Sequence, residues 1–283
     1  MSFVAIVGSG PLGGTVAHKL AARGRVDEVR LIDVEERVAQ GKALDILQSS
    51  PIESFATRVV GLGSLASVAG AAAIVIADRA TGDGEHSGEA GLSLLRQLIA
   101  MEGHAPIVFA GASQRELIAR AVGELSVPGA RLVGSAPFAL ESALRSLAGL
   151  ALDGSAVDVG LSIVGVPPAG AVVAWEEASV GGQPLTSRLP PHEIAALNAQ
   201  LPRLWPPGPY VLASAAARIV EGIVCGSRSQ FSCFAAGPHG VVSAMRVELG
   251  PDGIRRLIEP VLTRQERTRL ENSLEECGER ARE

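Results

Sequence analysis

The chain has 283 residues, of which 47% are apolar, and its formal net charge is −5. This length accommodates one large domain or two of ordinary size, and the apolar fraction is enough for a sizeable core. The negative charge gives no general attraction for nucleic acid or for an anionic membrane surface. No apolar run is long enough to span a membrane, so neither nucleic acid nor a membrane is expected as a partner.

The N-terminus and the cysteines favour a cytoplasmic protein. The chain enters an apolar run at residues 3–7 with no signal peptide before it. Its three cysteines, Cys225, Cys233 and Cys277, are odd in number and lack the spacing of metal ligands. We therefore expect reduced thiols, no metal site and a cytoplasmic location.

A glycine-rich stretch near the N-terminus carries the first functional signal. Residues 8–13 read Gly-Ser-Gly-Pro-Leu-Gly and lie between an apolar strand at 3–7 and a helical pattern. Gly-x-Gly-x-x-Gly in that context is typical of a dinucleotide-binding turn. Gly8 allows a tight turn, Gly10 lets the backbone approach a pyrophosphate, and Gly13 lets helix and strand pack closely. The free N–H groups at the start of the helix would then face the phosphates.

The second expected strand, residues 29–33, ends in an acid. Asp33 lies 20 residues after Gly13, where a carboxylate can accept the hydroxyls of the adenine ribose. It favours NAD over NADP, because a 2′-phosphate would meet a carboxylate and the next residue, Val34, supplies no cation. Pro11 lacks an N–H and removes one phosphate donor, although proline suits the first turn of a helix. The alternative interpretation is a glycine turn in another kind of α/β protein.

Strand and helix patterns alternate over the first 134 residues. Strands are expected at residues 3–7, 29–33, 58–62, 71–77, 106–110 and 131–134, and helices at 15–23, 34–48, 92–101 and 115–125. This alternation predicts a parallel, doubly wound sheet. Residues 81–91 are rich in glycine and charge and are expected to form a long loop at the carboxyl ends of the strands, where such sheets bind ligands.

The pattern changes in the second half of the chain. Helices are expected at 138–149, within 190–204, at 210–224 and at 264–283, strands at 157–166, 171–180, 230–235 and 241–248, and a linker at 206–209. We place the domain boundary near Gly134 and Ser135, which gives a dinucleotide-binding (Rossmann) domain at 1–134 and a second domain at 135–283. The alanines of residues 210–224 would allow close helix packing and predict self-association.

Several segments match one enzyme family in order and spacing. They are the glycine loop with Leu-Ile-Asp at 31–33, Gly-Lys-Ala-Leu-Asp-Ile-Leu-Gln at 41–48, Val-Gly-Ser at 133–135 with Leu-Glu-Ser-Ala at 140–143, Trp175 with Val-Gly-Gly-Gln-Pro-Leu at 180–185, and Val-Glu-Leu-Gly-Pro-Asp-Gly-Ile at 247–254. The chain resembles the NAD-dependent malate and lactate dehydrogenases over nearly its full length. The resemblance implies an α/β fold, a Rossmann-type doubly wound parallel sheet followed by an α+β malate/lactate dehydrogenase C-terminal domain. It also implies NAD as cofactor and a homodimer or homotetramer.

The departures from the family fall on its chemistry. Pro167 stands where the family has the histidine that takes the substrate proton, and proline cannot titrate or donate. Leu144 replaces the arginine that clamps the substrate carboxylate through two parallel bonds. Gly111 replaces the family's asparagine, and Gly91 stands at an arginine position of the lid loop. Glu141 takes the place of the aspartate that orients the missing histidine, so we nominate no catalytic residue.

No histidine is an obvious substitute for the missing one. His18, His104, His192 and His239 are expected to be solvated or locally bonded. His86 lies in the lid loop and could reach the pocket on closure, but a solvent-exposed loop histidine is the favoured interpretation.

The resemblance also implies which residues line the cofactor. They are Gly8, Gly10, Pro11, Leu12, Gly13, Asp33, Val34 and Ala77. Where the family passes Thr-Ala-Gly close to the dinucleotide, this chain has Asp78 directly after Ala77. If its carboxylate points inward, its charge opposes the pyrophosphate; the alternatives are that it points outward or pairs with Arg79.

Three functions follow from these observations. The leading hypothesis is a diverged malate/lactate dehydrogenase homologue, a pseudoenzyme that binds NAD and serves a binding or regulatory role. The second is an active NAD-dependent oxidoreductase on an unidentified hydroxy or keto substrate. The third is a structural or interaction protein with an empty cofactor cleft.

Overall fold

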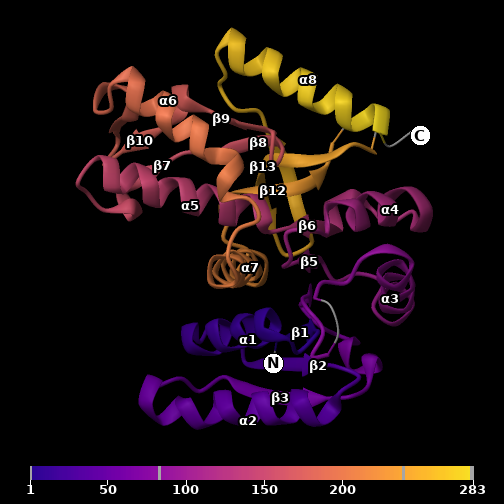
Figure 1. Cartoon of the computed structure of the whole chain (residues 1–283). Helices are drawn as coiled ribbons and strands as arrows, with labels where there is room; N and C mark the ends of the chain where they lie inside the picture. The colour runs from indigo at the N-terminus through magenta and orange to yellow at the C-terminus, as the bar shows by residue number, and fades with distance from the viewer. Residues whose placement is uncertain (1, 82–83, 238–239, 281–283) are drawn as a thin grey trace.

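A parallel sheet forms the first half of the computed structural model, which describes residues 2–81, 84–237 and 240–280 (Figure 1). Its strands are β1 (Phe3–Val7), β2 (Glu28–Ile32), β3 (Arg58–Leu62), β4 (Ala73–Ile76), β5 (Ile107–Phe109) and β6 (Leu132–Gly134). They lie in the order β3-β2-β1-β4-β5-β6, which is the doubly wound order of dinucleotide-binding folds. The predicted fold class is confirmed for this half.

Four helices connect these strands. They are α1 (Pro11–Arg23), α2 (Glu36–Glu53), α3 (Gly88–Met101) and α4 (Arg115–Leu125). Every residue of β4 is buried, as a central parallel strand covered on both faces requires. Helix α3 begins at Gly88, so the last residues of the loop predicted at 81–91 belong to this helix.

The second half continues the same sheet. Strand β12 (Gln230–Ala236) pairs antiparallel with β6, with Phe234 opposite Gly134. Beyond it lie β13 (Val242–Gly250), β8 (Ile163–Val166) and β9 (Gly170–Val173), and β14 (Gly253–Ile258) pairs with β13. The sheet thus runs across the predicted boundary at residue 134, and the division of the chain there stays a prediction.

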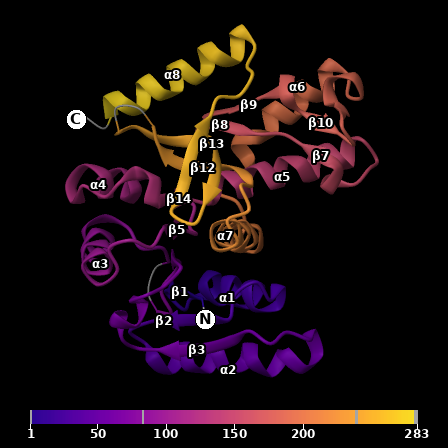
Figure 2. The ribbon, with the colours of Figure 1, turned by 180° about the vertical axis from the view of Figure 1, so that it is seen from behind.

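Helices and a small sheet complete the second half (Figures 1 and 2). The helices are α5 (Ala136–Ala151), α6 (Pro191–Gln200), α7 (Pro209–Val224) and α8 (Arg264–Arg280). A separate sheet contains β11 (Gln183–Pro184), β10 (Ser179–Val180) and β7 (Val159–Gly160). This mixed arrangement confirms the expected α+β character of the second half.

The strand pair predicted at 157–166 and 171–180 is wrong in extent. The first segment changes partner within its length: Gly160 pairs with Ser179 of β10, whereas Ile163 pairs with Val173 of β9. The second segment stops at Val173 because the chain turns there into a short 3₁₀ helix. Strand β14 was not predicted, because its exposed arginines obscure the alternating pattern of the strand.

Small residues join the two halves at the contact between α1 and α7. Ala213, Ala216 and Ala217 of α7 are fully buried and belong to the same apolar core as Ala17 of α1. An ion pair of 3.1 Å between Arg23 and Glu221 closes the end of this contact. The alanines that predicted self-association therefore pack inside the chain, and self-association stays a prediction.

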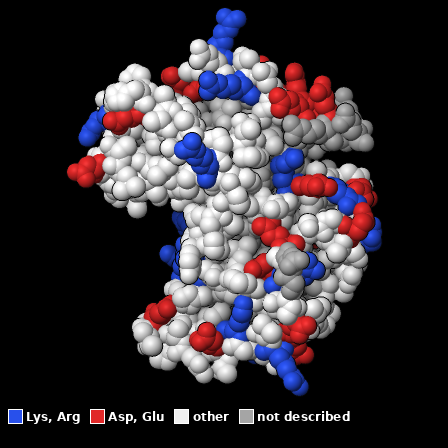
Figure 3. All heavy atoms as spheres, in the orientation of Figure 1, with Lys and Arg blue, Asp and Glu red and all other residues white. Residues whose placement is uncertain are grey.

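The surface carries charges of both signs. Figure 3 shows acidic and basic side chains scattered over one face, with no broad area of a single sign. Nowhere in residues 2–81, 84–237 and 240–280 is a helix both long and apolar enough to cross a membrane.

Two glycines of adjacent elements give a test of this architecture. A Cβ at Gly61 in β3 would overlap the backbone of Ala39 and Gln40 in α2, whereas Gly41 in α2 has no neighbouring atom within 4 Å. We expect Gly61→Ala to lower the free energy of unfolding by about 2 kcal/mol through overpacking. Gly41→Ala should raise it by about 0.5–1 kcal/mol, because alanine loses less backbone entropy in a helix.

Urea denaturation of both variants measures the difference. Equal effects of the two substitutions would contradict the close approach of α2 to β3.

Candidate dinucleotide site and the positions of the family's catalytic residues

The glycine loop between β1 and α1 is a tight turn against the sheet. Gly8 has φ of +107°, a conformation that favours glycine, and its N–H donates to the Ile32 carbonyl at 2.8 Å. A Cβ at Gly13 would overlap the Gly8 carbonyl oxygen, so only glycine allows the helix to start this close to the strand. Pro11 is the first residue of α1. The local geometry thus follows from the glycine spacing, whereas contact with a cofactor is a separate question.

Asp33 lies directly after β2 and accepts three backbone N–H groups. They come from Ser9 at 2.7 Å, Glu35 at 3.0 Å and Ala80 at 3.0 Å. Burial alone would raise the pKa of Asp33, but these N–H donors outweigh burial and hold the pKa below its usual value. The carboxylate of Asp33 therefore links the glycine loop, the start of α2 and the segment after β4. The side chain of Val34, the next residue, is 88% exposed.

Asp78 points inward, the first of the three orientations considered from the sequence. Its carboxylate accepts the N–H of Leu12 at 3.1 Å and the N–H of Gly13 at 2.9 Å. Its backbone carbonyl accepts the N–H of Gly10 at 3.0 Å. Ala77, one residue earlier, is fully buried. The side chain of Asp78 thus occupies the N-terminus of α1.

Glu85 plays a similar part at the next helix along the sheet edge. Its carboxylate accepts the N–H groups of Ala112 and Ser113, both at 2.8 Å, just before α4. A Cβ placed on Gly111 would overlap this carboxylate. Sequence reasoning missed Glu85, because nothing in a charged, glycine-rich loop indicates which amides a carboxylate will reach.

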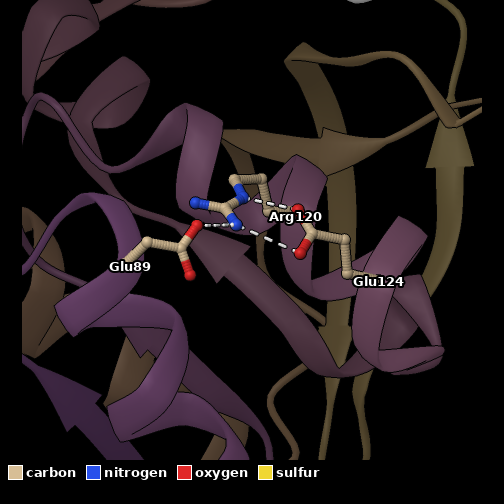
Figure 4. Close-up of polar contacts among 3 residues, drawn as sticks. All are labelled: Glu89, Arg120 and Glu124. Carbon is tan, nitrogen blue, oxygen red and sulfur yellow. Dashed lines mark hydrogen bonds and ion pairs between the residues drawn. The ribbon is translucent and has the colours of Figure 1, made fainter.

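An ion-pair network joins the first turn of α3 to α4 (Figure 4). Arg120 of α4 contacts Glu89 in the first turn of α3 at 2.5 Å and Glu124 one turn along α4 at 2.5 Å. The hydrogen bonds to Glu124 and then to Glu89 raise the pKa of Arg120 above its usual value. Glu89 and Arg120 were not singled out from the sequence either.

The structure describes four of the five histidines of the chain. His18 contacts Glu53 at 2.9 Å, His104 and His192 are exposed, and His239 lies outside the described residues. His86 is half-buried, so the expectation of a solvent-exposed loop histidine is wrong. Burial and Arg79 lower the pKa of His86, while Asp33 and Asp78 oppose that shift. His86 is thus placed among the groups around the glycine loop.

Pro167 lines a cavity of about 120 Å³ between the β8–β9 hairpin and α8. The titratable side chains of this cavity are Arg115, Glu276 and Cys277. No histidine of the described chain is among its lining residues. Leu144, which the sequence predicts to replace the family's arginine, is fully buried in an apolar cluster that includes Ile163 and Trp175.

Glu141 lines a different cavity of about 210 Å³, which shares no lining residue with the cavity at Pro167. Burial raises the pKa of Glu141 to about 7, although hydrogen bonds from Ser232 and the charges of Arg145 and Arg246 oppose that rise. The Ser162 hydroxyl in the same cavity is buried and has no hydrogen-bond partner among the described residues. Within the described ranges, no group of three or more acidic, histidine or cysteine side chains could hold a metal ion.

These features define an α/β protein of the dinucleotide-binding class. Residues 3–97 match the family model described as lactate/malate dehydrogenase, NAD binding domain. The malate dehydrogenase of Thermomicrobium roseum is 28% identical over 95% of this chain and 94% of its own length. The L-lactate dehydrogenase of Geotalea daltonii is 27% identical over 95% of both chains. The chain is thus similar to malate and lactate dehydrogenases over nearly its full length, and its residues 3–97 are similar to their NAD-binding domain.

Solved structures share the whole fold. Malate dehydrogenase from Salinibacter ruber superposes with a TM-score of 0.86 at 23% identity, covering 98% of this chain and 95% of the other. Lactate dehydrogenase from Cryptosporidium parvum, solved with lactic acid and nicotinamide adenine dinucleotide, gives 0.84 at 20% identity, covering 98% and 96%. The Rossmann domain followed by a mixed α+β domain is thus the architecture of these enzymes.

The cofactor that this family uses does not fit the site as this chain forms it. A dinucleotide of this fold lays its pyrophosphate on the N–H groups at the start of the first helix. Those of Leu12 and Gly13 already donate to the Asp78 carboxylate. The space that Gly10 leaves open is also filled, since a Cβ there would overlap the Asp78 side chain.

The raised pKa of Glu141 gives a test by pH. Its folded pKa of about 7 lies above the ordinary 4.5, so the folded chain holds a proton that the unfolded chain loses. The stability that this proton provides is complete below pH 4.5 and disappears as the pH rises through 7. Relative to Glu141→Gln, the free energy of unfolding of the unmodified chain should fall by roughly 3 kcal/mol across that window.

Denaturant titrations at several pH values measure this fall. Parallel stability curves for the two proteins would contradict a protonated, buried Glu141.

Proposed function

We propose that this chain keeps the fold of the malate and lactate dehydrogenases but does not oxidise 2-hydroxy acids or reduce 2-keto acids. In this proposal it is a pseudoenzyme with a binding or regulatory role. The observation that carries the proposal is Leu144, which is fully buried among apolar side chains where the family has its carboxylate clamp. A substrate carboxylate stripped of water beside leucine loses free energy with no compensating bond. An arginine introduced at this position would itself be buried in the apolar cluster, because the position belongs to the hydrophobic core.

The proton-transfer position supports the same proposal. Hydride transfer to a keto carbon leaves an alkoxide that must gain a proton, and a positioned acid or base typically contributes 10²- to 10⁴-fold. Pro167 supplies no such group. The asparagine position is also changed, because the Glu85 carboxylate fills the space that a side chain on residue 111 would need.

A second candidate function is an active NAD-dependent oxidoreductase on another hydroxy or keto substrate. Glu141 favours it, because a carboxyl group with a pKa of about 7 suits general acid–base chemistry near neutral pH. Its cavity is lined by Arg246 and three serines but by no residue of the glycine loop. Hydride transfer from a nicotinamide needs the acid–base group and the bound cofactor in one site, so we favour the binding role.

Any dinucleotide admitted to this cleft is proposed to be NAD rather than NADP. Asp33 is an ionised, buried carboxylate at the end of β2, and Val34 beside it offers no cation to a 2′-phosphate. The proposed contacts are those of the glycine loop, with Asp33 as the selective group.

Absence of family activity is the first expected outcome. With NADH and millimolar oxaloacetate or pyruvate, we expect turnover of at most about 0.1 s⁻¹, since the median enzyme reaches about 10 s⁻¹ and the acid–base contribution is missing. Absorbance of NADH measures it for the unmodified chain and for Asp78→Gly, so that lack of cofactor is separated from lack of chemistry. Turnover near 10 s⁻¹ with either acid would refute the proposal.

Self-association is proposed through α2, which carries two exposed apolar side chains. Leu44 is 56% exposed and Ile52 is 86% exposed, and a helix face of this kind gains by burial against a second copy. We expect light scattering at micromolar concentration to show a species larger than 29.1 kDa, and Ile52→Glu to shift it toward the monomer.

Leu150→Glu is the matched control, because Leu150 is 77% exposed at the end of α5. A 29.1 kDa species alone for the unmodified chain would rule out self-association under these conditions.

A further inference from the structure

We propose that Asp78 is an internal ligand of the dinucleotide site: its carboxylate stands in for a cofactor phosphate and closes the site to NAD and NADP in this chain. The proposal goes beyond the absence of keto-acid chemistry, because it concerns binding of the cofactor itself.

The backbone donors of the glycine loop are all in use. Each N–H from residue 9 to residue 14, apart from proline, has an internal acceptor: Ser9 donates to Asp33, Gly10, Leu12 and Gly13 to Asp78, and Gly14 to Gly10. A pyrophosphate binds such a loop through these N–H groups. It would therefore have to break existing hydrogen bonds before making its own.

The space above the loop is filled by the same residue. A Cβ on Gly10 would overlap the carboxyl group of Asp78 and approach the carbonyl oxygen of Arg79. In a dinucleotide-binding turn this glycine is small so that the pyrophosphate can lie against the backbone. Here the carboxylate lies in that space.

Electrostatics at the start of α1 favour the Asp78 carboxylate over a cofactor phosphate. The N-terminus of α1 carries a partial positive charge that favours an anion, and Asp78 supplies one from within the chain. A tethered group acts at an effective concentration of millimolar or more, so a free cofactor must outcompete it. A phosphate that enters beside the carboxylate meets charge repulsion at short range.

The described residues on the segment that carries Asp78 make further contacts with the rest of the fold. Ala80 donates its N–H to Asp33 at 3.0 Å, and Asp78 forms a β-bridge with Glu85. Glu85 holds the amides before α4, and Glu89 pairs with Arg120 (Figure 4). Removal of Asp78 from the loop would thus require the segment to break contacts with β2, α4 and α1 together.

Titration of NAD into the unmodified chain and into Asp78→Gly tests the proposal. For the unmodified chain we expect a Kd above about 1 mM, and for Asp78→Gly binding tighter by at least about tenfold, because two amide donors and the space over Gly10 become available. In Asp78→Gly, NAD should bind more tightly than NADP because of Asp33. Calorimetry measures all four affinities.

Two further variants keep the test decisive. Asp78→Asn removes the charge at nearly constant volume and should give an intermediate gain, which covers the case in which Asp78→Gly does not fold. Asp45→Asn removes one exposed carboxylate from α2 of the same half and should bind as the unmodified chain does. Hydrogen exchange adds a readout without ligand: the amides of residues 9–14 should exchange faster in Asp78→Gly.

Tight binding of NAD by the unmodified chain, with a Kd near 10 μM or below, would overturn the proposal, as would folded Asp78→Gly and Asp78→Asn that gain nothing. The same variants separate it from the proposed function. If Asp78→Gly gains NAD binding and also reduces a keto acid, the closed site stands and the absence of keto-acid chemistry fails. If it gains binding without turnover, both stand.

Discussion

The structure depends on how the backbone N–H groups at the carboxyl edge of the parallel sheet find acceptors. A helix leaves its first N–H groups without partners in its own backbone, and a doubly wound sheet gathers several helix starts at one edge. Buried amides without acceptors are costly. In this chain three carboxylates meet the need: Asp33 beside the glycine loop, Asp78 at α1 and Glu85 before α4. The dinucleotide fold is therefore complete without a dinucleotide.

The same edge shows why retained motifs and retained function are separate matters. Gly8 and Gly13 are required by the turn itself, because a side chain at either position would overlap nearby backbone. Selection for the fold alone is enough to keep them. Gly10 is different, since the neighbour that a side chain would meet there is chiefly Asp78. A glycine motif of this kind thus indicates a strand–turn–helix unit. It indicates a phosphate site only when no side chain fills the space next to its second glycine.

Periodicity and spacing predicted the first half of the fold well, because each strand and helix there repeats one simple pattern. The failures have physical causes. Residues 157–166 are mostly apolar, yet their backbone changes partner between Gly160 and Ile163, which no hydrophobic pattern records. The direction of Asp78 was left open between three orientations, because it depends on the turn after β4. The partners of Glu85 lie 27 and 28 residues away, and local sequence carries no signal for them.

The pairing of Phe234 with Gly134 bears on how the chain can be divided. A fragment that ended at residue 134 would leave the edge of β6 unpaired and would uncover the face of α1 that the alanines of α7 bury. Open strand edges and bare apolar faces promote association between chains. The N-terminal half alone would therefore expose an open strand edge and an apolar helix face. Shuffling it into another protein would require a substitute for β12 and α7.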